Sequence, residues 1–224
     1  MKVGTDGVLL GAWCPIERFG TQDSRLRILD VGTGSGLIAL MLAQRCPEAQ
    51  ISAIDIDAAA VAQAQENFNH SPWADRLRAQ HISLQELAAS RLQTFHLIVS
   101  NPPYFIDSLK NPDKQRQVAR HTDSLSYNEL ITCAAKLLHP EGALALILPA
   151  ESEADILTFA KEAGLSPTRL THVYSKPGKA AKRLLVCFAK STRSQACLQA
   201  DFYIESETSP RSEEYAFLTR DFYL

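Results

Sequence analysis

The stretch Asn101-Pro102-Pro103-Tyr104 has the residue types best suited to chemistry in this sequence. It directly follows Phe95–Ser100, an apolar run that predicts a strand. Consecutive prolines have fixed φ angles and donate no hydrogen bonds, so the Pro102 carbonyl is held rigidly as an acceptor. The side-chain oxygen of Asn101 and this carbonyl can each accept one N–H of an exocyclic amine, which localises the nitrogen lone pair and stabilises the positive charge that grows there. Tyr104 offers a flat face for stacking of an extruded base.

A glycine-rich turn earlier in the chain predicts a second functional element, a nucleoside site. The segment Asp30-Val-Gly-Thr-Gly-Ser-Gly36 follows one predicted strand and precedes a predicted helix. Gly32, Gly34 and Gly36 allow a tight turn whose main chain a ligand can approach closely. Asp55, at the end of the next predicted strand, can accept hydrogen bonds from both hydroxyls of a ribose.

The residues around this turn favour S-adenosylmethionine over a dinucleotide. The dinucleotide pattern G-x-G-x-x-G requires glycine where this chain has Leu37. Asp30 would repel a pyrophosphate at the helix N-terminus, but it suits the cationic amino-acid tail of S-adenosylmethionine. The segment resembles motif I of class I methyltransferases. That resemblance implies that Ile56 packs on the adenine ring and that Ser83 lies near the adenine edge.

Two further resemblances narrow the chemistry. The tetrapeptide 101–104 resembles the (D/N)PP(Y/F) motif of amino-methyltransferases, which act on adenine N6, cytosine N4, guanine N2 or a glutamine amide. The segments Met1–Trp13, Tyr174–Val186 and Glu213–Leu224 resemble the bacterial tRNA1(Val) adenine N6-methyltransferases. That family implies methylation of the adenosine beside the anticodon, nucleotide 37. Its members carry a short lead-in before Lys2, and weaker cofactor binding is expected here if that lead-in shields the cofactor.

The family resemblance completes the set of predicted site residues. It implies that Thr5 and Asp6 lie over the cofactor and that the loop Lys176–Arg183 meets the RNA backbone. The predicted catalytic residues are Asn101, Pro102 and Tyr104. The predicted cofactor contacts are Thr5, Asp6, Asp30, Gly32, Thr33, Gly34, Gly36, Asp55, Ile56, Ser83 and Asn101. The predicted RNA contacts are Pro103, Tyr104, Lys176, Lys179, Lys182 and Arg183.

Composition and charge set the class of protein. The chain has 224 residues, of which 46% are hydrophobic and 21% charged, as in an ordinary globular domain. No apolar run is long enough to span a bilayer. The five cysteines form no C-x-x-C pair, so we expect neither a zinc site nor disulfides, and a reducing cytoplasm is the expected compartment. A metal and a membrane are not expected, and a monomer is favoured.

The distribution of charge indicates where RNA would bind. The net charge is −2, but residues 163–200 carry seven Lys or Arg and no acid, whereas residues 201–224 carry six acids and two arginines. A basic segment on a near-neutral protein is a candidate footprint for phosphates. More basic residues follow the tetrapeptide, at Lys110, Lys114, Arg116, Arg120 and His121.

Alternating strands and helices predict one α/β domain over residues 1–224, with a Rossmann-like, mostly parallel seven-stranded sheet, an antiparallel end strand and helices on both faces. Residues 1–25 are expected to cover the cofactor, and residues 198–224 to form an edge strand and tail. The predicted strands are Arg27–Val31, Gln50–Ile54, Leu77–Ile82, Phe95–Ser100, Ala143–Leu148, Leu170–Tyr174 and Leu184–Ala189, with Leu198–Ile204 as a candidate edge strand. The predicted helices are Leu37–Arg45, Ala58–Phe68, Ser126–Leu138 and Glu151–Ala163.

The same motifs are compatible with other functions. Enzymes that methylate a glutamine amide in translation release factors use the same tetrapeptide, although they usually carry an added N-terminal helical domain. Another nucleic-acid amino-methyltransferase is a further alternative. A binding module that has lost catalysis is disfavoured by the intact Asp30, Asp55, Asn101 and Tyr104. An NAD oxidoreductase is disfavoured by Leu37.

Overall fold

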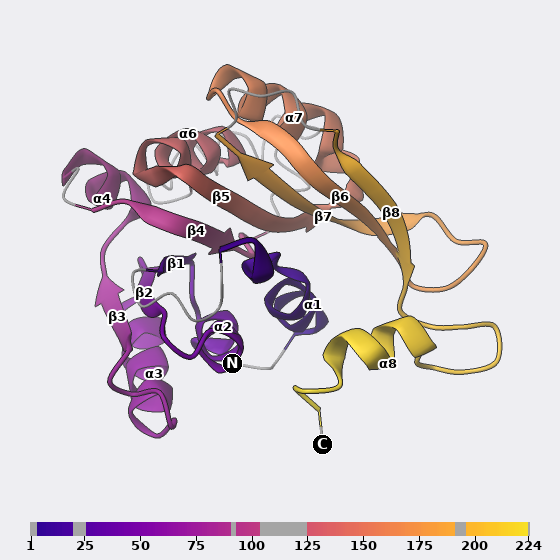
Figure 1. Cartoon of the computed structure of the whole chain (residues 1–224), viewed down its shortest axis with the longest axis horizontal. Helices are drawn as coiled ribbons and strands as arrows, with labels where there is room; N and C mark the ends of the chain where they lie inside the picture. Colours follow the sequence, from indigo (N-terminus) through magenta and orange to yellow (C-terminus); the bar gives the residue numbers. More distant parts are fainter. Residues whose placement is uncertain (1–3, 20–25, 91–92, 104–124, 191–195, 224) are drawn as a thin grey trace, which may run out of the picture.

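The computed structural model describes residues 4–19, 26–90, 93–103, 125–190 and 196–223. Strands and helices alternate through most of these residues, and the helices pack on both faces of a single sheet (Figure 1). The strands are β1 (Arg27–Val31), β2 (Gln50–Asp55), β3 (Leu77–His81), β4 (Phe95–Ser100), β5 (Leu138–Pro149), β6 (Ser166–Tyr174), β7 (Ala181–Ala189) and β8 (Leu198–Tyr203). The helices are α1 (Thr5–Trp13), α2 (Leu37–Arg45), α3 (Ala58–Asn69), α4 (Leu84–Ser90), α6 (Tyr127–Leu137), α7 (Glu153–Glu162) and α8 (Glu213–Thr219), with short 3₁₀ turns at Ile16–Phe19 and Ala150–Ser152.

The sheet confirms the predicted fold class and corrects two of its details. Its strand order is β3-β2-β1-β4-β5-β7-β6-β8, so the described residues form eight strands rather than seven. The antiparallel strand is β7, and it lies between β5 and β6 instead of at the end. Residues 184–188 of β7 are fully buried, so this strand needs neighbours on both sides, whereas β8 buries only Phe202 and takes the edge.

The carboxyl ends of the parallel strands define one functional end of the sheet. β1, β2, β4 and β5 all terminate there, at Val31, Asp55, Ser100 and Pro149. We call this the carboxyl end of the sheet. In open α/β sheets, ligands bind at this end.

The two faces of β5 show how the layers are packed. Ala143, Ala145 and Ile147 face the core beneath α1, α2 and α3, while the larger Leu144, Leu146 and Leu148 face the core beneath α4, α6 and α7. The two small alanines leave room for α1 to lie close against the sheet.

Local signals fixed several helix boundaries as predicted. The Asp57 side chain accepts a hydrogen bond from the Ala59 N–H at 2.8 Å and caps α3. Ser126 and Glu129 form the predicted capping box of α6. Gly164, with φ of 74°, closes α7. The helices α1, α4 and α8 were not predicted. Among the residues described, no helix has the length and apolar character needed to cross a bilayer.

Candidate active site

The glycine turn lies at the carboxyl end of the sheet and is bonded to the neighbouring strand. The N–H groups of Gly32 and Thr33 both donate to the Ile54 carbonyl, at 2.9 and 3.1 Å. Gly32, Gly34 and Gly36 all have φ between 57° and 83°, the left-handed region that favours glycine. A Cβ on Gly36 would lie 2.5 Å from the Phe68 ring, so this position also needs glycine for packing.

The Gly32 position is different because it is open. A Cβ there would meet no atom within 4 Å, and the residue is exposed. The backbone of the turn is therefore accessible at Gly32, as a ligand that touches the main chain requires.

Asp30 lies buried beneath the turn. Its Oδ2 accepts hydrogen bonds from the Thr33 hydroxyl at 2.7 Å and from the Ala39 N–H at 3.2 Å. Its Oδ1 is buried and has no hydrogen-bond partner among the described residues. Burial raises the pKa of Asp30 to about 6, against the opposing effect of these two hydrogen bonds. A buried carboxylate with an unused acceptor atom favours a cationic partner.

Asp55 both supports the turn and retains capacity for a ligand. Its Oδ2 accepts from the Gly34 N–H at 2.9 Å, and its Oδ1 accepts from the Asp57 N–H at 3.0 Å. A carboxylate has about four lone-pair sites, so further hydrogen bonds can form. The neighbouring Ile56 is 54% exposed, which is unusual for a large apolar side chain and leaves it available to a flat ligand.

Ser83 has a local role that the sequence interpretation did not include. Its hydroxyl donates to Glu86 Oε2 at 2.7 Å, and it accepts from the Glu86 N–H at 3.2 Å. The residue thus caps α4, and this hydrogen bonding lowers the pKa of Glu86. A contact with the adenine edge would have to use its remaining lone pair.

The tetrapeptide begins next to the glycine turn. Ser100 pairs in register with Val31, and its buried hydroxyl donates to the Val31 carbonyl at 2.8 Å. Gly32 and Asn101 therefore directly follow two paired residues of adjacent strands, which lie about 5 Å apart by the usual strand spacing. Asn101 is half-buried, Pro102 is buried and Pro103 is exposed.

Part of the predicted site lies outside the described residues. This applies to Tyr104 and to the basic residues of 110–121. The remaining predicted positions are distributed over the end of β1, the glycine turn, the ends of β2 and β4, the segment between β3 and α4, the first turn of α1 and the region around the β6–β7 connection.

The β6–β7 connection differs from the expected loop 176–183. β7 begins at Ala181, so Lys182 and Arg183 are strand residues. The reason is register: Arg183 pairs with both Pro149 and Val173, so sheet pairing extends the strand beyond the apolar run that signalled it. Lys176 and Lys179 are exposed in the turn, and Lys182 is also exposed.

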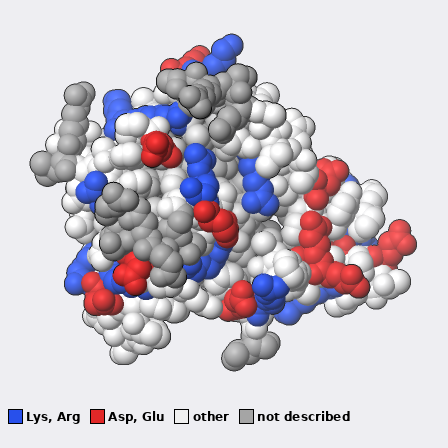
Figure 2. Space-filling view, in the orientation of Figure 1, with Lys and Arg blue, Asp and Glu red and all other residues white. Residues whose placement is uncertain are grey.

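The environment of Lys176 is less favourable for an anion than its sequence suggests. A groove of about 520 Å³ separates the Lys176–Pro177 turn from the segment that precedes α8. Besides those two residues, it is lined by Glu205, Ser206, Glu207, Thr208, Ser209 and Pro210. The two glutamates oppose the charge of Lys176. Figure 2 shows acidic side chains gathered on the side of the molecule where the β8–α8 segment lies.

The strand order, the glycine turn at the carboxyl end of the sheet and the adjoining tetrapeptide define a Rossmann-like, class I methyltransferase. The family model "Methyltransferase small domain" matches residues 11–159. Among solved structures, a "predicted O-methyltransferase" from Agrobacterium tumefaciens superposes with a TM-score of 0.73 and 20% identity, over 96% of each chain. A TehB-like SAM-dependent methyltransferase from Corynebacterium glutamicum gives a TM-score of 0.53 and 17% identity, over 83% of this chain and 88% of that one.

Sequence relatives identify the family within this class. The tRNA1(Val) (adenine(37)-N6)-methyltransferase of Phocaeicola vulgatus is 49% identical, over all of this chain and 91% of its own length. The enzyme of the same name from Flavobacterium psychrophilum is 43% identical, over all of this chain and 93% of its own. The chain belongs to the tRNA1(Val) (adenine(37)-N6)-methyltransferase family.

Proposed function

We propose that this protein transfers a methyl group from S-adenosylmethionine to N6 of the adenine at nucleotide 37, next to the anticodon of tRNA1(Val). The observation that carries the chemistry is the pairing of Val31 with Ser100, the residues that directly precede Gly32 and Asn101. The names of the relatives support the substrate. A tRNA substrate implies a cytoplasmic reaction, and we propose that residues 1–224 act as one domain and as a monomer.

The residues of the turn fit the cofactor. The turn formed by Gly32, Thr33, Gly34 and Gly36 would hold its amino-acid tail, and the unpartnered Oδ1 of Asp30 suits the charge of its ammonium. Asp55 would accept from the ribose and the exposed Ile56 would pack on the adenine, with Ser83 near its edge. Thr5, Asp6 and Asn101 would complete the enclosure. When bound, the cofactor supplies a methyl group on a sulfonium.

The chain's own contribution to catalysis is orientation and electrostatics. The Asn101 side-chain oxygen and the Pro102 carbonyl would each accept one N–H of the target amine, which turns the nitrogen lone pair away from the ring and stabilises the charge that develops on it. The remaining contribution is alignment of the nitrogen with the methyl group. No strong general base is required, because the methylated nitrogen is acidic and loses its proton readily. Pro103 and Tyr104 would contact the extruded base.

The RNA backbone would meet the cations around the β6–β7 connection. Of the four predicted contacts, Lys179 and Lys182 are the best candidates for phosphates, because they are exposed and do not line the acidic groove. Lys176 would contribute less, because it lines the acidic groove.

Asp30 gives the first prediction, on the pH dependence of cofactor binding. A cationic ligand binds the ionised carboxylate, so binding releases the proton that Asp30 holds below its pKa of about 6. We expect the affinity for S-adenosylmethionine, measured by calorimetry from pH 5 to 8, to be constant above pH 7 and to fall by up to about tenfold per pH unit below 6. Asp30→Asn should bind weakly at every pH, without this dependence. A wild-type affinity that is flat down to pH 5 would contradict the role of Asp30.

The second prediction tests the function itself. Incubation with radiolabelled S-adenosylmethionine should label total tRNA, and nucleoside analysis should recover the label as N6-methyladenosine at a single position. Free adenosine and a translation release factor serve as parallel substrates and should stay unlabelled. If the label appeared on glutamine in the release factor and not in tRNA, the proposal would be wrong and the protein would be a glutamine methyltransferase.

A further inference from the structure

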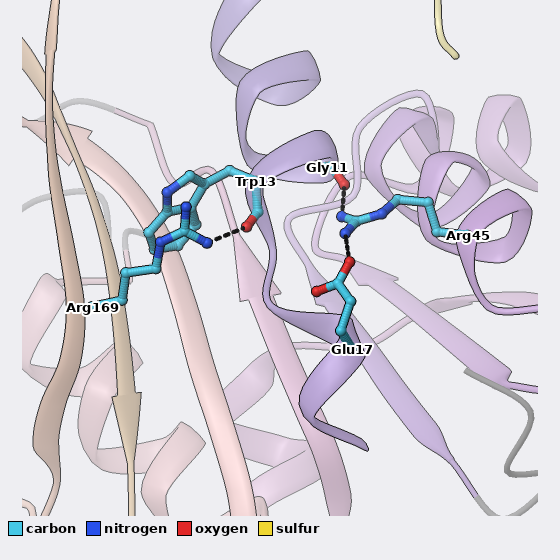
Figure 3. Close-up of polar contacts among 5 residues, drawn as sticks. All are labelled: Gly11, Trp13, Glu17, Arg45 and Arg169. Carbon is cyan, nitrogen blue, oxygen red and sulfur yellow. Dashed lines mark hydrogen bonds and ion pairs between the residues drawn. The ribbon is translucent and has the colours of Figure 1, made fainter. Parts of the chain in front are cut away.

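Helix α1 is anchored at its carboxyl end by two arginines from different layers of the fold. Arg169 of β6 donates to the Trp13 carbonyl at 3.3 Å, and its guanidinium lies 4.5 Å from the Trp13 ring. Arg45 of α2 donates to the Gly11 carbonyl at 2.7 Å and also binds Glu17 at 2.7 Å (Figure 3). These contacts compensate carbonyls that the end of a helix leaves without partners. The carboxyl end of α1 is thus fixed to both the sheet and α2.

The path of α1 leads from this anchor towards the candidate active site. A Cβ on Gly11 would lie 2.7 Å from Met41, and one on Gly7 would lie 3.3 Å from Leu37, the first residue of α2. The small residues let α1 pack closely along α2. Because α2 begins immediately after Gly36, the first turn of α1 lies beside the glycine turn.

The first turn of α1 is also connected to β7, through an ion pair between Asp6 and Arg183. Arg183 Nε donates to Asp6 Oδ2 at 3.0 Å, and their side chains are 28% and 23% exposed. Arg183 pairs with Pro149, the last residue of β5, so its side chain leaves β7 at the carboxyl end of the sheet. Because β5 lies between β4 and β7 in the sheet, the ion pair lies two strands beyond the strand that carries Asn101.

We propose that Arg183 is a positioning residue for methyl transfer: through Asp6 it holds the first turn of α1 at the carboxyl end of the sheet, beside the glycine turn. The proposal rests on the proposed function for the identity of the site. It differs from the sequence interpretation, in which Arg183 contacts the RNA backbone. An arginine that is mostly buried and paired with a carboxylate presents less net charge to a phosphate than the exposed Lys182 beside it.

A double-mutant cycle tests this role. We expect Arg183→Gln and Asp6→Asn each to weaken S-adenosylmethionine binding and to slow single-turnover methylation by on the order of tenfold, the usual size of a coupling between sites. The double variant should be no worse than either single variant, because both remove the same contact. Arg183→Lys should restore part of the loss. The matched control, Lys182→Gln, should weaken tRNA binding and leave cofactor affinity unchanged.

Three outcomes would overturn the proposal. Additive losses in the double variant would mean that the two residues act separately. A lowered melting temperature with normal cofactor affinity and normal single-turnover rate would mean a structural role only. A raised tRNA Kd in Arg183→Gln, without change in cofactor affinity, would make Arg183 an RNA contact. Cofactor affinity is measured without RNA, so the cycle remains decisive even if the wild-type protein methylates another substrate.

Discussion

Asn101→Ala is expected to lower the rate of methyl transfer by about 10²–10³-fold, the usual loss when one pre-organised hydrogen-bonding group is removed from an active site. The substitution deletes the side-chain oxygen that would accept an N–H of the target amine, and the lone pair of that amine would stay delocalised in the ring. We expect S-adenosylmethionine affinity to stay near normal, because the turn that would hold the cofactor is bonded through Asp55 and Ile54. Single-turnover kinetics with saturating tRNA measure the chemical step directly.

Asn101→Asp is the matched control for this prediction. It keeps a side-chain oxygen at the same position, and the related motif allows either residue, so this variant should retain more activity than Asn101→Ala. A full rate in Asn101→Ala would show that the assigned mechanism is wrong. A rate lost in parallel with cofactor affinity would instead make Asn101 primarily a cofactor contact.

Charge reversal at Lys179 and Lys182 should have the second large effect. The double variant Lys179→Glu/Lys182→Glu removes two cations and adds two anions on an exposed surface. We expect the tRNA Kd to rise by on the order of 10²-fold at low salt and the slope of log K against log salt to flatten by about 1.5, because fewer counterions are released on binding. Filter binding over a series of salt concentrations measures both quantities.

A second double variant with the same change in charge distinguishes the loss of local RNA contacts from an effect of the protein's net charge. Lys136 and Lys161 are exposed on α6 and α7, which cover the opposite face of the sheet from α1 (Figure 1). Lys136→Glu/Lys161→Glu should leave the salt slope unchanged. If both double variants weakened tRNA binding equally, the effect would be one of net charge. If Lys179→Glu/Lys182→Glu left tRNA binding unchanged, the RNA would bind elsewhere on the protein. S-adenosylmethionine affinity should be the same in the wild type and in both double variants.

The sequence by itself determined the parts of this protein that depend on neighbouring residues. A helix cap such as Asp57 acts on an N–H two residues away, and the capping box joins Ser126 to Glu129, three positions away, so both can be predicted from short motifs. The same is true of the glycine turn, whose positive φ angles follow from residue type. The carboxyl ends of parallel strands all lie at the same end of a sheet. The placement of the glycine turn and Asn101 at that end therefore also followed from the order of the elements.

Only the tertiary structure decided which distant residues meet. Asp6 and Arg183 are 177 positions apart, and no local pattern distinguishes an arginine that binds RNA from one that pairs with a distant helix. The interior position of β7 likewise followed from burial on both faces, which depends on what covers the strand. Helix α1 carries apolar residues on most of its surface, so it lacks the periodic signal of an amphipathic helix, and its place was set by α2, the sheet and the arginines at its ends.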